Sequence, residues 1–144
     1  MLFKTEEFIV DLPGDWEQFP GDGDAQFQFE SKTLKASVVI SYFLVQFGRE
    51  NMLRAAEVSL AARLEALEKL GPHQLHKNFA EVLDEGPMAH SVLLGQNSDS
   101  VFWSEAWATE AKVIHLWVAI EETDLERAQK TIADVVAGFG FYIP

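Results

Sequence analysis

The spacing of apolar and polar residues predicts strands in the first part of the chain. Residues 3–12 alternate and indicate a first strand, which ends at a Pro-Gly turn. Over residues 25–30, phenylalanines two positions apart alternate with polar residues, which is the period of a half-buried strand. Residues 36–47 are apolar at nearly every position and rich in β-branched and aromatic residues, as in a strand covered on both faces. Three strands are therefore expected before the first helix.

A change of period marks that helix. Between Glu50 and Leu70, leucine and alanine recur every three or four residues, while the charged residues lie mostly off that stripe. Gly71 and Pro72 follow, and these residue types end helices. The segment is predicted to be an amphipathic helix of about five or six turns.

The next part of the sequence predicts an antiparallel meander of four strands. The expected strands are residues 74–83, 89–96, 101–109 and 113–121. If Glu110 and Ala111 form the last loop, the cross-strand pairs are Trp107 with Ile114, Trp103 with Val118, Ser104 with Trp117, and Ala106 with His115. Tryptophan then lies on both faces, so either a helix covers each apolar face or one face binds a partner.

A capping box at Thr123 and Glu126 predicts the start of a terminal helix, with an apolar stripe from Leu125 to Phe139. The element order is therefore β-β-β-α-β-β-β-β-α. It predicts one α+β domain over residues 1–144, in which helices pack on an antiparallel sheet of about six or seven strands.

Composition narrows the classes of function. The 144 residues include no cysteine, and 23 acidic against 11 basic residues give a net charge of −12. The missing cysteine excludes thiol chemistry and disulfides, and the negative charge disfavours nucleic acid and favours a basic protein partner. The apolar runs are too short to cross a bilayer, and the first residues lack a signal-peptide pattern. We expect a cytoplasmic protein without membrane insertion.

No catalytic or cofactor motif stands out. The sequence has no nucleophile elbow, no glycine-rich phosphate loop and no dinucleotide fingerprint, and its four histidines lack metal-ligand spacing. Glu105 and His115, near tryptophans, form the most site-like group, but the predicted register places these two on opposite faces. We therefore expect no enzyme activity, no metal and no cofactor.

The element order and two short segments resemble a known fold. The segments are Leu12-Pro13-Gly14-Asp15-Trp16 after the first strand and Val38-Val39-Ile40-Ser41 in the long strand. They resemble the PsbP-like α/β/α sandwich, which is shared by the photosystem II extrinsic subunit, a Ran-binding transport factor, DcrB-type lipoproteins and Eag-type chaperones of type VI secretion. The chain lacks the lipobox cysteine of the DcrB type, and residues 17–20 replace the Asp-x-Ser-x-Asn segment usual in the Eag type. The resemblance implies a mostly non-enzymatic scaffold that holds other proteins.

Three functions remain open on the sequence. The first is a non-catalytic protein-binding factor, such as a type VI secretion chaperone or adaptor or a toxin-neutralising immunity protein, whose partner is basic or exposes an apolar segment. The alternatives are a small-molecule binder or enzyme with a pocket between helix and sheet, and a structural subunit of a larger assembly; a homodimer also stays open. The expected partner-binding residues are aromatic side chains with an acidic rim: Trp16, Phe19, Asp22, Asp24, Trp103, Trp107 and Trp117. Packing in the core is the alternative role for the tryptophans.

Overall fold

A seven-stranded antiparallel sheet forms the centre of the protein. The computed structural model describes residues 1–20, 26–46, 48–84 and 88–142. The strands lie in the order β3-β4-β5-β9-β8-β7-β6. Their bounds are β3 (Trp16–Phe19), β4 (Gln26–Ser31), β5 (Ala36–Leu44), β6 (Gln74–Leu83), β7 (Met88–Gln96), β8 (Val101–Ala108) and β9 (Lys112–Ile120). The predicted meander is thus β6 to β9, and it joins the earlier strands where β9 pairs with β5.

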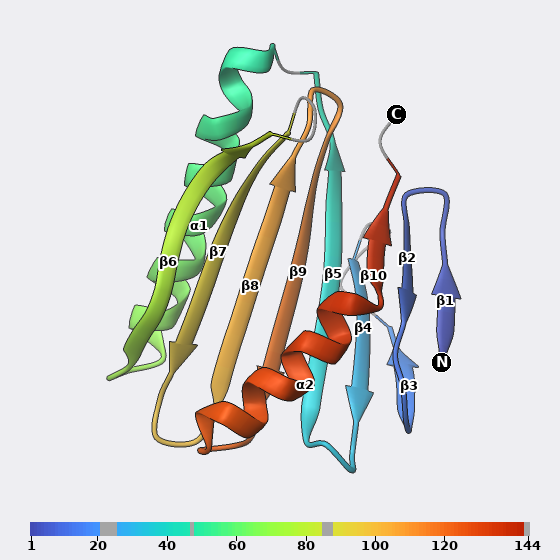
Figure 1. Ribbon diagram of the computed structural model, residues 1–144, viewed down its shortest axis with the longest axis vertical. Coiled ribbons are helices and arrows are strands. Elements are labelled where there is room, and N and C mark those ends of the chain that lie inside the picture. The colour runs from blue at the N-terminus through green and yellow to red at the C-terminus, as the bar shows by residue number, and fades with distance from the viewer. Residues whose placement is uncertain (21–25, 47, 85–87, 143–144) are drawn as a thin grey trace.

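The two faces of this sheet carry different elements (Figure 1). One face carries a helix and a small antiparallel sheet, namely α2 (Leu125–Ala137) with β1 (Leu2–Lys4), β2 (Phe8–Asp11) and β10 (Phe139–Phe141) in the order β1-β2-β10. The other face carries α1 (Met52–Lys69), which follows a short 3-10 helix, η1 (Arg49–Asn51). This arrangement confirms the predicted α+β class. Neither helix is long and apolar enough to span a bilayer, a statement that covers the described residues.

The main core lies between the large sheet and the small sheet. Phe8 of β2 is fully buried, and its ring meets that of Phe27 edge-on at a centroid distance of 5.2 Å. Phe29 is fully buried on the same side of β4. Burying one such side chain stabilises the fold by about 1.5–3 kcal/mol. The alternation of phenylalanine and polar residues that predicted β4 is therefore the alternation of core and outer face.

The hairpin of β8 and β9 has the predicted register. The Thr109 hydroxyl accepts hydrogen bonds from the backbone N–H groups of Ala111 and Lys112, at 3.2 and 3.0 Å. These bonds fix the length of the loop, and loop length fixes which residues face each other. The observed pairs are Trp107 with Ile114, Trp103 with Val118, Ser104 with Trp117, and Ala106 with His115.

The N-terminal segment differs from the prediction. The single strand expected over residues 3–12 is two strands, because the Thr5 hydroxyl accepts from the N–H groups of Glu7 and Phe8 (3.0 and 3.1 Å) and turns the chain back. Trp16–Phe19, which lies between the predicted strands, forms β3 and pairs with β4. The hydrogen bonds that the Thr5 hydroxyl accepts thus form a turn between two strands. The alternation of apolar and polar residues alone could not predict this turn.

The C-terminal segment also differs. Asp124, not Thr123, caps α2, and its carboxylate accepts from the N–H of Arg127 at 3.2 Å. The apolar stripe was expected to continue to Phe139, but Phe139–Phe141 leaves the helix and forms β10 beside β2. Gly138 allows this change of direction, because a Cβ atom there would collide with the Asp11 carbonyl oxygen.

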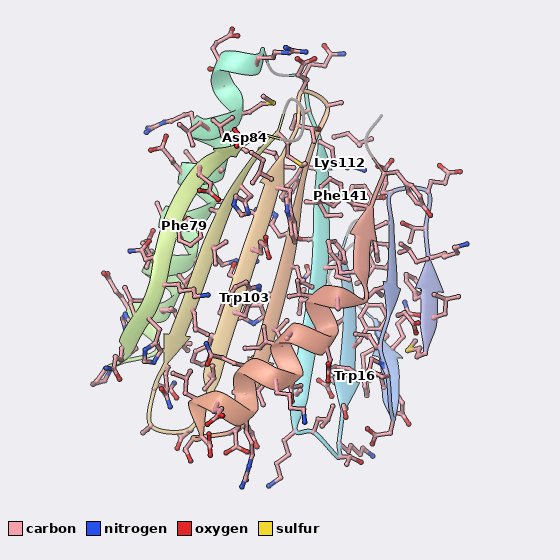
Figure 2. All side chains as sticks on the ribbon, in the orientation of Figure 1. Trp16, Phe79, Asp84, Trp103, Lys112 and Phe141 are labelled. Atoms are coloured by element: carbon pink, nitrogen blue, oxygen red, sulfur yellow. The ribbon has the colours of Figure 1, made fainter. Side chains whose placement is uncertain are left out.

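A buried lysine fastens the small sheet to the large one (Figure 2). Lys112 is 1% exposed, and its Nζ donates to the Glu7 carboxylate at 2.8 Å and to the Glu7 carbonyl oxygen at 3.1 Å. It also donates to the Tyr142 carbonyl oxygen and lies over the Phe141 ring. The three protons of the ammonium therefore have three acceptors, which is what a buried charge requires.

Candidate functional site

Helix α1 lies over one half of the sheet, chiefly β6, β7 and β8 (Figure 1). On the same face, the side chains of β4 and β5 lie beside the helix, and those of β9 form the boundary. We call this surface the open sheet face; its residues are Gln26, Gln28, Glu30, Ser37, Val39, Ser41, Phe43, His115, Trp117 and Ala119. Val39 lies opposite Trp117 and Ser41 opposite His115, so the surface is continuous across the strands.

An apolar hollow of about 460 Å³ opens where α1 meets the open sheet face. Phe43 from β5 and Val58 from α1 are 58% and 54% exposed at its rim. The other residues that line the hollow are Val45, Asn51, Arg54, Ala55, Ser59, Val113 and His115. Large apolar side chains that gather around a hollow mark sites where proteins bind other molecules.

The imidazole of His115 forms part of this hollow and is neutral near pH 7. Burial, and next the charge of Arg63, lower the pKa of His115 to about 4. The Nε2 atom lies 2.9 Å from the Ser59 hydroxyl of α1, and the Phe43 ring packs edge-on against the imidazole at 5.9 Å. This part of the hollow therefore presents an uncharged surface.

Trp117 lies further along the same face, beneath an arginine. The Arg63 guanidinium sits 5.0 Å from the centre of the indole ring, and burial lowers the pKa of Arg63. Phe102 stacks on the indole at 5.6 Å. Trp117 thus belongs to the open sheet face, but other side chains cover much of its ring.

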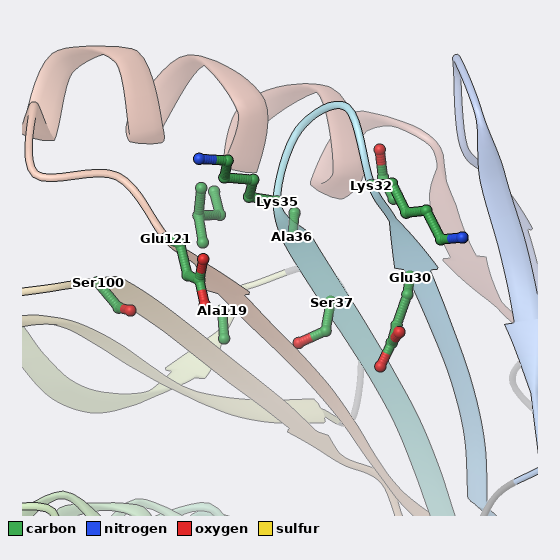
Figure 3. A pocket seen from close by; sticks show the side chains of 10 residues that line it. Glu30, Lys32, Lys35, Ala36, Ser37, Ser100, Ala119 and Glu121 are labelled. Atoms are coloured by element: carbon green, nitrogen blue, oxygen red, sulfur yellow. The ribbon is translucent and has the colours of Figure 1, made fainter.

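A second hollow, of about 470 Å³, lies at the other end of the sheet and is more polar (Figure 3). Acidic residues from different strands or their ends, Glu30 and Glu121, line it together with Ser37 and Ser100. Lys32 and Lys35, the first and last residues of the turn between β4 and β5, also line it. The open sheet face therefore changes from apolar at the start of α1 to polar at this end, where two acidic and two basic side chains line the hollow.

The other sequence-predicted partner residues do not gather on one surface. Trp16 is 6% exposed in the core, where its indole N–H donates to the Pro13 carbonyl oxygen at 3.1 Å. This position supports a role in packing rather than in partner contact. Phe19 is partly exposed on the edge strand β3, and Asp22 and Asp24 lie outside the described residues.

Trp103 and Trp107 lie on the opposite face from Trp117. Trp107 stacks on Phe139 of β10 at 5.3 Å, and Lys77 lies over the Trp103 ring at 5.8 Å. Both side chains are half-buried. Both rings pack against the main core, so the three hairpin tryptophans do not make a single aromatic patch.

An unexpected polar cluster lies beside them. Glu105 and His115 are on opposite faces, as the register predicted, and the imidazole near Glu105 is His90. Its Nδ1 lies 3.2 Å from the Glu105 carboxylate, and its Nε2 lies 2.7 Å from that of Glu81. Burial raises the pKa of Glu105, and the hydrogen bond and charge of His90 partly offset that effect. Among the described residues, no group of three or more His, Asp or Glu side chains is arranged to hold a metal ion.

The sequence missed His90 because the cluster spans three strands. Glu81 faces His90 across β6 and β7, and Glu105 lies diagonally across β7 and β8. Both strands were predicted, but no register was predicted for the β6–β7 hairpin. That register would have placed Glu81 opposite His90.

Solved structures with this architecture place the chain in a known fold. Cyanobacterial PsbP (CyanoP) from Synechocystis sp. PCC 6803 matches with a TM-score of 0.71 at 12% identity, over 99% of this chain and 92% of that one. The Ran-binding protein Mog1p of Saccharomyces cerevisiae matches with a TM-score of 0.50 at 8% identity, over 92% and 89%. A Bacteroides thetaiotaomicron protein matches with a TM-score of 0.50 at 16% identity, over 94% of this chain but 45% of its own.

At these identities the likeness defines the fold, and the chain has a PsbP-like fold, as its sequence predicted. The sequence matches no protein-family model and no curated protein.

Proposed function

We propose that this chain is a non-catalytic protein-binding factor that receives an apolar helix of another protein on the open sheet face. The observation that carries the proposal is the apolar hollow between α1 and the open sheet face. Phe43 and Val58 each expose more than half of their surface there. Keeping such side chains in water is unfavourable, and a partner that covers them gains the free energy of their burial.

The dimensions of the surface suit one helix. Neighbouring strands lie about 4.8 Å apart, so β4, β5 and β9 give a floor about 10 Å wide. A helix with its side chains is about 10–12 Å across. A partner helix would therefore lie beside α1 as a second helix on the same face, with its apolar stripe over the hollow at Phe43.

The charges along the face define the complementary helix. Arg54 of α1 lines the apolar hollow, whereas both glutamates and lysines line the polar end. A helix with an apolar stripe, an acidic residue near Arg54, and polar residues able to pair with charges of both signs at the other end would complement this surface. The net charge of −12 favours encounter with a basic partner.

The fold and composition are compatible with this role. Mog1p, a protein of the same fold, is a Ran-binding protein, so a member of this architecture binds another protein. Of the two specific roles raised by the sequence, a secretion chaperone or adaptor holds an apolar segment, whereas an immunity protein covers a toxin surface. The apolar hollow favours the chaperone or adaptor, acting in the cytoplasm, where a chain without cysteine is at no disadvantage.

Photocrosslinking from matched positions tests the proposal. The photoreactive residue p-benzoylphenylalanine is placed at Phe43, at Val58, or at Leu2, which is similarly exposed but lies on the small sheet. We expect the first two positions to capture one and the same protein in the producing cell, through a helical apolar segment, and Leu2 to capture none of it.

A second variant separates binding from folding. Phe43→Glu should abolish binding of the purified partner while the near-ultraviolet circular dichroism of the domain is unchanged, because Phe43 is largely exposed. Equal capture from Leu2, or undiminished binding by a folded Phe43→Glu variant, would contradict the proposal.

The same hollow supports a second candidate, a small-molecule-binding protein. Its volume of about 460 Å³ falls within the usual range of ligand sites, and Ser59, Arg54 and His115 supply polar groups. Native mass spectrometry of the purified protein distinguishes the two. A small molecule that co-purifies, and that Ala55→Phe removes by filling the hollow, would favour this alternative.

A further inference from the structure

Strand β6 forms one edge of the large sheet, far from the open sheet face. Among the described strands it pairs with β7 alone. Most of its residues are exposed, and Phe79 and Val82 are 41% and 58% exposed. An edge strand offers a row of backbone N–H and C=O groups to any strand that can lie alongside it.

The side chains of β6 are arranged symmetrically about Phe79. Lys77, Phe79 and Glu81 share one face, because alternate residues of a strand point the same way. Phe79 packs edge-on against the His90 ring at 5.9 Å, and Glu81 is held by His90 at 2.7 Å. Phe79 is labelled on this outer strand in Figure 2. Two opposite charges thus lie at equal distances from a central aromatic residue.

We propose that β6 pairs with β6 of a second copy of this chain, antiparallel and centred on Phe79. In that register Lys77 of each copy lies opposite Glu81 of the other, and the two Phe79 rings are neighbours. Opposite charges and aromatic side chains that face each other across strands stabilise pairing. Moving the centre to Asn78 or Ala80 places Lys77 opposite Phe79 or Leu83 and removes both ion pairs, so the charges select one register.

The same pattern excludes most other partners. A lysine in the middle of an edge strand normally prevents pairing with foreign strands. Here Glu81 supplies the matching acid, but only for a strand with the same spacing, which the chain itself provides. The Glu81 side chain is about half exposed while it holds His90, so it can reach a second cation.

The geometry indicates a weak dimer. The register of β6 against β7 is irregular between Leu75 and Lys77, which limits the straight part of the edge to residues 77–83. Such a short seam buries less surface than permanent dimers do, so association should depend on concentration. The two-fold axis would stand perpendicular to the sheet, with β3 of each copy at an outer end and β4 and β5 next to it. The dimer is therefore independent of the partner-binding role.

Charge-reversal variants test the register. In Lys77→Glu, and in Glu81→Lys, like charges face each other across the seam, so sedimentation velocity should show the dimer dissociation constant raised at least about tenfold. An equimolar mixture of the two variants should dimerise again, because each then meets the opposite charge. The double variant should also dimerise by itself. Lys130→Glu on α2 makes the same change in net charge as Lys77→Glu, away from β6, and serves as its control.

Each outcome bears on the proposal. Recovery in the mixture, with unaltered dimerisation of Lys130→Glu, supports the β6 pair. A wild-type chain that stays monomeric up to millimolar concentration overturns it. So does a dimer that both single variants leave unchanged, or a mixture that fails to recover, since the charges would then not face each other.

Discussion

Replacing His115 by glutamine should remove one source of acid sensitivity from the fold. Burial and Arg63 lower the pKa of His115 from 6.5 to about 4 in the folded protein. As the pH falls from about 6.5 toward about 4, the unfolded chain binds a proton at this position before the folded chain does. The contribution of His115 to the free energy of unfolding is therefore complete above about pH 6.5 and is lost as the pH falls toward about 4. Between pH 7 and pH 5 the loss from this single group is about 2 kcal/mol.

Urea unfolding of the wild type and of His115→Gln, at several pH values from about 7 to about 5, measures this effect. Carboxylates titrate in both proteins, so their effect cancels in the difference between the two free energies of unfolding. This difference should shift by about 2 kcal/mol in favour of His115→Gln between pH 7 and pH 5. Ser59→Ala, which keeps the imidazole but removes its hydrogen-bond partner, should retain the pH dependence. Parallel stability curves for wild type and His115→Gln, or an NMR titration of the His115 ring near its ordinary pKa, would refute the reasoning.

The remaining predictions concern the core and the buried groups Glu105 and Lys112. Phe8→Ala should lower the free energy of unfolding by about 3–5 kcal/mol in denaturant titrations; a loss below about 1 kcal/mol would contradict its place in the core. Glu105→Gln should raise the melting temperature more at neutral than at acidic pH. Burial raises the pKa of Glu105, so its charge costs stability as the pH rises through that pKa, and an equal shift at both pH values would argue against this. Lys112→Met should lower the free energy of unfolding by about 3–5 kcal/mol, because it leaves the Glu7 carboxylate without its partner. Adding Glu7→Gln should restore part of that free energy. If it restores none, the two side chains are not energetically coupled.

Local patterns predicted the elements whose partners are close in the sequence. The register of β8 and β9 followed from a two-residue loop, and α1 followed from the spacing of its leucines and from Gly71, which has the left-handed backbone that ends a helix (φ 107°). In both cases the sequence signals lie within a few residues of each other.

Pairings between distant segments could not be predicted in this way. Phe139–Phe141 continued a helical stripe, and only the approach of β2 explains why it forms β10. The open sheet face could not be predicted either. The spacing of leucines shows that one side of α1 is apolar, but it does not show which strands that side covers. The tryptophans were predicted to bind a partner because this residue type is common in interfaces. The apolar hollow instead is lined mainly by small and aliphatic residues around Phe43, which carry no such signal in the sequence.

The position of β2 between β1 and β10 also has a consequence for the synthesis of the protein. A ribosome releases Phe8 and Val10 early, but their neighbours in β10, residues 139–141, leave the exit tunnel more than a hundred residues later. Until then these side chains lack part of the surface that buries them. The small sheet should therefore assemble only after residues 139–141 have left the ribosome, as a late folding step, and a nascent chain stalled before residue 139 should remain open to proteases at its N-terminal strands.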